Sequence, residues 1–159
     1  MKTKHRQASK AKRRWQADPT SLTRFISRFQ PFSQAEVNNI VLPPRVAFES
    51  MRNGQGTAQD FGTLADAINI TLARSKKMDA LCIETCNLAI RSMQRTHERY
   101  MRIGRYGFDG PALQDIALVL DLFDQFVKLG TPQQLFDAIN TVKKDIRAGN
   151  FHDLEGVTV

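Results

Sequence analysis

Positively charged side chains crowd the amino-terminal end of this sequence, and their chemistry suits the binding of a polyanion. Seven of them precede the first acidic residue, Asp18: Lys2, Lys4, Arg6, Lys10, Lys12, Arg13 and Arg14. The chain has 23 Lys and Arg in all, and the other 16 balance its 16 Asp and Glu, so the formal charge of +7 resides in this segment. If all seven engaged a nucleic-acid duplex, the logarithmic salt slope of binding would reach about −6.

Trp15 follows these cations directly, where its ring can stack on an unpaired base or anchor the segment on the folded body. Residues 1–17 lack apolar periodicity, so they are predicted to form a flexible basic arm. Nucleic acid, either DNA or RNA, is the favoured partner of this arm. The alternatives are electrostatic attachment to an acidic protein and a solubilising tail without a specific partner.

A second group of cations recurs at helical spacing further along the chain. Its members fall within about 80° on one helix face and extend the predicted nucleic-acid-binding surface: Arg91, Arg95, Arg99 and Arg102. Glu98 is spaced to pair with Arg95 and Arg102. The alternative, which is favoured for this row, is therefore a solvent-exposed helix face whose charges pair with one another. Arg105 and Tyr106 are expected to continue this row into the following loop.

No residue pattern predicts catalysis or a metal site. Cys82 and Cys86 are too few for a disulfide framework, and their spacing places both on one helix face, as reduced thiols in the core. The three histidines are scattered, and no nucleophile stands at a persuasive spacing from a base. The chain is therefore predicted not to be an enzyme, and to need no metal and no cofactor.

Capping residues and helix breakers divide the rest of the chain into helices. The predicted starts are Asp18, Ser33, Thr57, Asp109 and Thr131. The predicted ends are Pro31, Gly54, Gly104, Gly130 and Gly149. Two of the longer helices are expected over about residues 58–74 and 76–103. Pro43 and Pro44 are expected to break or kink the helix that begins after Ser33, with Pro44 opening another short helix.

Together these elements predict an all-α fold, a compact bundle of five to six helices with the flexible basic arm attached. The domain boundaries expected are 1–17 for the arm, 18–149 for the bundle and 150–159 for a tail. The helix after Asp109 is so apolar that it is expected near the centre of the bundle. No apolar run is long enough to span a membrane and no signal peptide is recognised, so a cytoplasmic location without membrane contact is expected.

The stretch from Asn53 to Ile146 resembles small helical proteins encoded on proteobacterial phages and plasmids, some of which are described as Fis-like regulators. The similar features are a basic leader, the run from Arg52 to Thr57 ahead of an apolar helix that contains Leu64 and Ile68, and a closing pair of helices. The resemblance implies an origin in a bacterial mobile element and carries no site residue over to this chain.

The function predicted from these patterns is that of a non-enzymatic accessory or regulatory protein that binds nucleic-acid phosphates through its arm. One alternative is a phage or plasmid protein that docks on a host factor or inhibits a defence system; another is a homo-oligomeric helical scaffold. The apolar residues expected on a docking surface lie in the less regular segments: Phe32, Val46, Phe48, Met51, Met101 and Tyr106.

Overall fold

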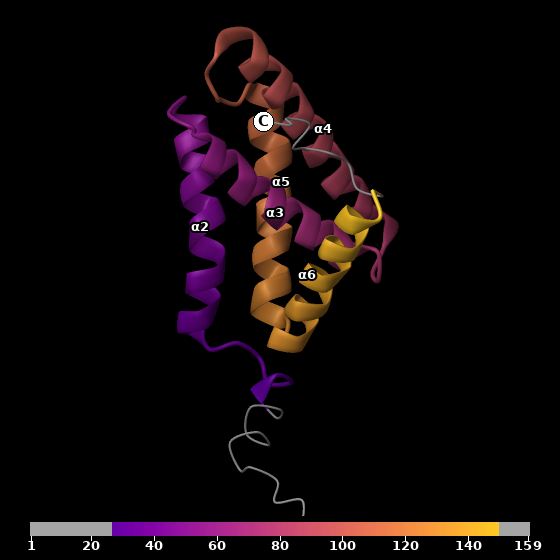
Figure 1. Cartoon of the computed structure of the whole chain (residues 1–159). Helices are drawn as coiled ribbons and strands as arrows, with labels where there is room; N and C mark the ends of the chain where they lie inside the picture. The colour runs from indigo at the N-terminus through magenta and orange to yellow at the C-terminus, as the bar shows by residue number, and fades with distance from the viewer. Residues whose placement is uncertain (1–26, 150–159) are drawn as a thin grey trace, which may run out of the picture.

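The computed structural model describes residues 27–149, which form a bundle of helices (Figure 1). The helices are α2 (Gln34–Arg52), α3 (Ala58–Ser75), α4 (Ala80–Ile103), α5 (Gly110–Leu129) and α6 (Pro132–Arg147). Within these residues the β pairing is limited to one isolated antiparallel bridge between Gly56 and Tyr106. The predicted all-α bundle is confirmed. The predicted arm, the helix start at Asp18 and the tail lie outside the described residues.

Side chains at the predicted capping positions start the helices. Within residues 27–149 there are three capping boxes, in which each of two residues accepts a hydrogen bond through its side chain from the backbone N–H of the other. They pair Ser33 with Glu36, Thr57 with Asp60, and Thr131 with Gln134. Asp109 caps α5 as predicted. The predicted start of the long helix at residue 76 is wrong: residues 76–78 form a turn, and Asp79 caps α4 by accepting a bond from the Cys82 N–H at 2.9 Å.

Helix α2 continues through Pro43 and Pro44, so the prediction of a separate helix that begins at Pro44 is wrong. Each proline removes one backbone hydrogen bond, and packing compensates for the loss. Pro44 is buried. The next residue, Arg45, donates hydrogen bonds to Asp121 and Asp124 of α5. Burial disfavours the charge of Arg45, but the bonds to both carboxylates outweigh it and raise its pKa. These contacts between α2 and α5 could not be read from local sequence.

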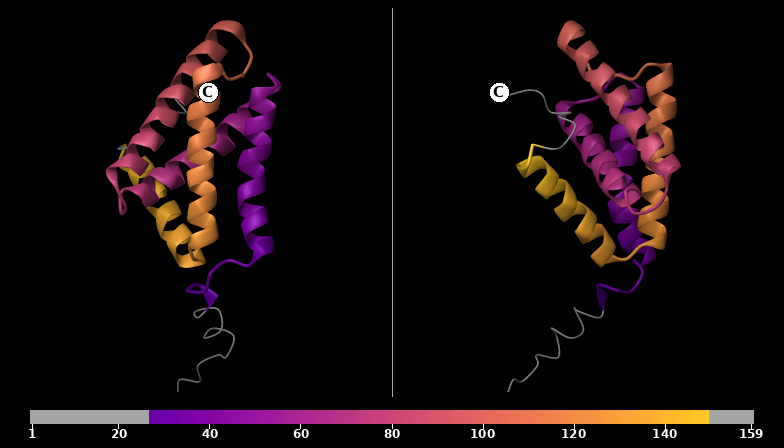
Figure 2. Two further views of the ribbon diagram at one scale, coloured as in Figure 1. Left: turned by 180° about the vertical axis from the view of Figure 1, so that it is seen from behind. Right: turned by 90° about the vertical axis from the view of Figure 1, so that its right-hand side faces the viewer.

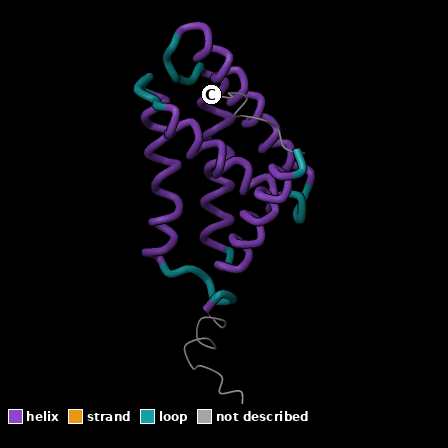
Figure 3. Tube along the Cα trace, viewed as in Figure 1, coloured by secondary structure: helices purple, strands orange, loops and turns teal. Residues whose placement is uncertain are grey.

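Helix α3 contacts all four of the other described helices, and α5 packs against α2, α3 and α4 (Figure 2). The two loops that follow α2 and α4 lie at the same end of the bundle (Figure 3). Helix α6 diverges from α5 and packs on α3 (Figure 2). None of the described helices is long and apolar enough to cross a membrane.

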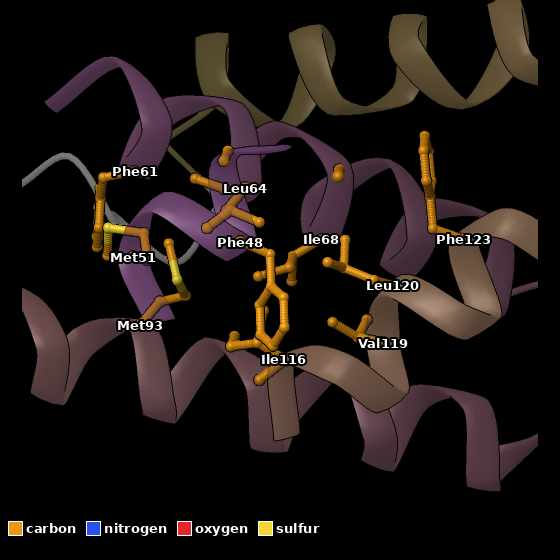
Figure 4. Close-up of a cluster of buried hydrophobic side chains, with 14 of the residues drawn as sticks. Phe48, Met51, Phe61, Leu64, Ile68, Met93, Ile116, Val119, Leu120 and Phe123 are labelled. Atoms are coloured by element: carbon orange, nitrogen blue, oxygen red, sulfur yellow. The ribbon is translucent and has the colours of Figure 1, made fainter. Parts of the chain in front are cut away.

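The core lies where α2, α3, α4 and α5 meet (Figure 4). Its large fully buried side chains include Met51, Leu64, Ile68, Met93, Ile116 and Leu120. Three residues that were expected on an exposed docking surface, Phe48, Met51 and Tyr106, are buried, so that prediction is wrong for them. Val46 and Met101 are exposed, as expected for such a surface.

Two glycines, one with no room for a side chain and one with open space around it, allow a matched test of local packing. An added Cβ at Gly130 would lie 2.4 Å from the backbone oxygen of Phe126, whereas one at Gly62 inside α3 meets nothing within 4 Å. We expect Gly130→Ala to lower the free energy of unfolding by about 1–3 kcal/mol, because the loop must shift. Gly62→Ala is expected to raise it by about 0.5–1 kcal/mol, because alanine favours the helix. Urea unfolding measures both, and changes of the same sign would contradict this account.

Candidate functional site

A polar cavity of about 250 Å³ lies where the loops after α2 and α4 meet. It is lined by the guanidinium-bearing side chains of Arg52, Arg99 and Arg105, and we call it the arginine pocket. The other lining residues are Met51, Asn53, Gly54, Ile103, Gly107 and Phe108. Helix α2 supplies Arg52, α4 supplies Arg99, and the loop after α4 supplies Arg105.

Backbone contacts hold the two loops together. Gly54 has a φ of 69°, in the left-handed region that glycine enters without strain, and this turns the chain after α2 toward the second loop. The Phe108 N–H donates to the Met51 carbonyl oxygen at 3.3 Å, and Gly56 pairs with Tyr106 in the antiparallel bridge. The pocket is therefore formed by segments that are about 50 residues apart in the chain yet hydrogen-bonded to each other.

Aromatic rings fix the loop that carries Arg105. The ring of its neighbour Tyr106 stacks on Tyr100 of α4, with centroids 3.9 Å apart and an interplanar angle of 2°, and it also stacks on Phe61 of α3 at 5.1 Å. Burial raises the pKa of Tyr106, and the neighbouring Tyr100 adds to the shift. Arg105 thus extends from a loop that is anchored on two helices.

The pocket carries an excess of positive charge, because none of its lining residues is Asp or Glu. Arg52 approaches Glu49 at 3.5 Å, but both side chains are more than half exposed, and such a pair is weak and screened by salt. Among residues 27–149, neither Arg99 nor Arg105 forms an ion pair. Guanidinium groups bind phosphate oxygens with paired hydrogen bonds, so the arrangement suits a phosphate-bearing ligand.

The four arginines of the predicted row on α4 have different surroundings in the structure. Arg99 lines the pocket, whereas Arg91 and Arg102 are exposed on the open face of the helix. Arg95 donates to the Ser92 hydroxyl at 2.7 Å and lies 3.8 Å from the Asp115 carboxylate of α5. Only part of the row is therefore free to contact a ligand.

The expected pairing of Glu98 with Arg95 and Arg102 is wrong. Glu98 forms no ion pair within the described part of the chain, and the carboxylate that Arg95 meets belongs to Asp115. The Ser92 hydroxyl, which accepts a bond from Arg95, also donates to the Asp115 carboxylate. These contacts place the Arg95 guanidinium beside α5 and away from Glu98 on its own helix. Helical spacing predicted the wrong partner because a carboxylate on a second helix lies within reach.

The predicted residues of the arm lie outside the described residues: Lys2, Lys4, Arg6, Lys10, Lys12, Arg13, Arg14 and Trp15. Sequence reasoning missed Arg52 as a site residue and gave Arg105 only as a continuation of the row. Arg52 lies close to Gly54 and Arg105 follows Gly104, and both glycines have a positive φ. These glycines were the sequence signal that the two arginines lie at helix ends. The sequence did not indicate that these two ends meet.

The two cysteines differ in their surroundings. Cys86 is fully buried as predicted, beside the Ser75 hydroxyl at 3.6 Å, and burial raises the pKa of its thiol to about 11. Cys82 is only half-buried, so its prediction as a core residue is wrong. Within residues 27–149, no group of three or more His, Cys, Asp or Glu side chains is placed to hold a metal ion.

Comparisons with protein-family models, with curated proteins and with solved structures found no match for this chain. The resemblance to small phage and plasmid proteins therefore stays a prediction.

Proposed function

We propose that this chain is a non-enzymatic nucleic-acid-binding protein with an accessory or regulatory role, and that its arginine pocket contacts the phosphate backbone. The observation that carries the proposal is the convergence of Arg52, Arg99 and Arg105 on one cavity without a lining carboxylate. Arg91 and Arg102 on the open face of α4 extend the same positive surface. The basic residues 2–14 add an attraction that does not depend on the fold.

The chemistry of the guanidinium groups also indicates whether the proposed binding depends on base sequence. Guanidinium contacts to phosphate position a nucleic acid but carry no sequence information. The pocket draws its cations from α2, from α4 and from the loop after α4, so the three do not share one helix face. The proposed binding is therefore mainly independent of base sequence and steeply dependent on salt.

A single substitution in the pocket tests the proposal. Arg99→Gln is expected to weaken binding to labelled oligonucleotides about fivefold at 0.15 M salt and to reduce the logarithmic salt slope by about 0.9, because one phosphate contact is lost. Fluorescence anisotropy across a salt series, with duplex and single-stranded oligonucleotides, measures both quantities and shows which form is preferred.

The matched control is Arg147→Gln, which removes the same charge from an exposed position at the end of α6. It is expected to leave affinity and slope nearly unchanged. Equal effects of the two substitutions would show that only net charge matters, and the pocket would then have no role. Absence of binding by the unmodified chain at low salt would remove the proposed function altogether.

A further inference from the structure

A second cavity, of about 360 Å³, lies between the end of α3 and helix α6, and we call it the α3–α6 cavity. It shares no lining residue with the arginine pocket. Its volume falls in the range of about 300–1,000 Å³ that small-molecule sites occupy. The lining residues are charged at three positions, polar at two and apolar at three: Arg74, Lys77 and Asp137, then Gln134 and Thr141, and finally Ala73, Met78 and Ala138.

The charged side chains of this cavity come from two walls and do not pair with each other. Arg74 belongs to α3 and Lys77 to the turn that follows it, whereas Asp137 belongs to α6. Within residues 27–149, none of the three forms an ion pair, so neither cation contacts the Asp137 carboxylate. A ligand that carries both a negative and a positive group can therefore make charge-assisted hydrogen bonds to both walls.

Arg74 is the cation best placed to hold the negative group. Its guanidinium lies 5.4 Å from the centroid of the Phe126 ring of α5, which orients the side chain. Burial lowers the pKa of Arg74. A part-buried cation gains more from an incoming anion than an exposed one does, because water and salt screen the attraction less. Lys77 is exposed and adds a second, more screened charge.

The opposite wall offers acceptors that suit an amino group. One oxygen of the Asp137 carboxylate accepts a hydrogen bond from the Gln133 side chain at 2.8 Å, which orients the carboxylate and leaves its second oxygen available. The Thr141 hydroxyl donates to the Asp137 backbone oxygen at 2.9 Å, so the hydroxyl oxygen can still accept. An ammonium group has three donors and can use both of these acceptors.

We propose that the α3–α6 cavity binds a free α-amino acid with an apolar side chain. Its carboxylate contacts Arg74, and its ammonium group contacts Asp137 and Thr141. Its side chain packs against Ala138 and Met78, since the thioether of Met78 is flexible and 58% exposed. This site goes beyond the proposed nucleic-acid binding and does not depend on it.

Titration of the full chain with L-leucine, followed by nuclear magnetic resonance, tests the proposal. The amide signals that shift should be those of the end of α3 and of α6. L-Leucinamide lacks the carboxylate and N-acetyl-L-leucine lacks the ammonium group. Each analogue is expected to bind about tenfold more weakly than L-leucine, because it loses one charge-assisted contact.

Two substitutions assign each charge of the ligand to its wall. Arg74→Gln is expected to remove the preference for L-leucine over L-leucinamide, and Asp137→Asn the preference over N-acetyl-L-leucine. Asp137 is exposed, so this second variant keeps the test independent of any effect of Arg74 on packing against Phe126. Lys144→Gln, at an exposed position of α6 outside the cavity, is the control and should retain both preferences.

Three results would overturn the proposal. The first is the absence of shifts with L-leucine at millimolar concentration. The second is equal binding of acetate at the same residues, which would mean that the cavity holds an anion without recognising an amino group. The third is that both preferences persist in the Arg74→Gln and Asp137→Asn variants, because the amino acid would then bind elsewhere.

Discussion

Replacement of Arg52, Arg99 and Arg105 together by glutamine is expected to weaken binding to nucleic acid roughly 100-fold at 0.15 M salt, because each lost phosphate contact removes about a factor of five. The logarithmic salt slope should fall by about 2.7 for duplex DNA. The three side chains line the arginine pocket from two helices and a loop, and none of them is buried in the core. The fold should therefore tolerate the change, which circular dichroism and thermal unfolding verify.

A second triple variant controls for the loss of net charge. Lys128→Gln, Lys143→Gln and Arg147→Gln remove three exposed cations from α5 and α6, away from the pocket. If this variant binds as weakly as the pocket variant, attraction is a property of total charge alone. Deleting residues 2–14 in both backgrounds then separates the contribution of the arm from that of the pocket.

Leu64→Ala is expected to lower the free energy of unfolding by about 3–4 kcal/mol. Leu64 is fully buried on α3, the helix that contacts each of the other described helices, and its side chain lies at the centre of the core (Figure 4). Truncation leaves a cavity that neighbours on several elements would have to fill together. Urea unfolding followed by circular dichroism measures the loss.

The control for this variant is Leu118→Ala on α5, where the side chain is 58% exposed. Its effect is expected to stay within about 0.5 kcal/mol, as for other surface substitutions. A loss of similar size at both positions would mean that α3 is not the structural centre of the bundle.

The parts of the fold that were predicted correctly are those that depend on a few neighbouring residues. A capping box is complete within four residues, so Ser33 and Glu36, or Thr131 and Gln134, mark a helix start wherever that helix packs. The continuation of α2 through Pro43 and Pro44 was not predictable in this way. It depends on burial of Pro44 and on bonds from Arg45 to carboxylates nearly 80 positions away.

The candidate site shows the same division. The periodic arginines of α4 could be recognised as one row, but their partners could not, because Asp115 approaches Arg95 from another helix. Arg52 is the last residue of α2 and gains its role only where two loops meet. The lengths of α2 and α4, the angle at which they cross and the contact between the loops that follow them together determine where these loops meet. No short sequence pattern encodes this contact.

The stacked rings beside Arg105 have a practical consequence for experiments in solution. Tyr100 and Tyr106 are the only two tyrosines of the chain, and Trp15 is its only tryptophan. Phenol rings 3.9 Å apart and nearly parallel couple their electronic transitions, so the tyrosine bands in near-ultraviolet circular dichroism report on this one loop. Indole fluorescence reports on the amino-terminal segment alone. The loop beside the arginine pocket and the basic segment therefore carry separate optical labels without any chemical modification.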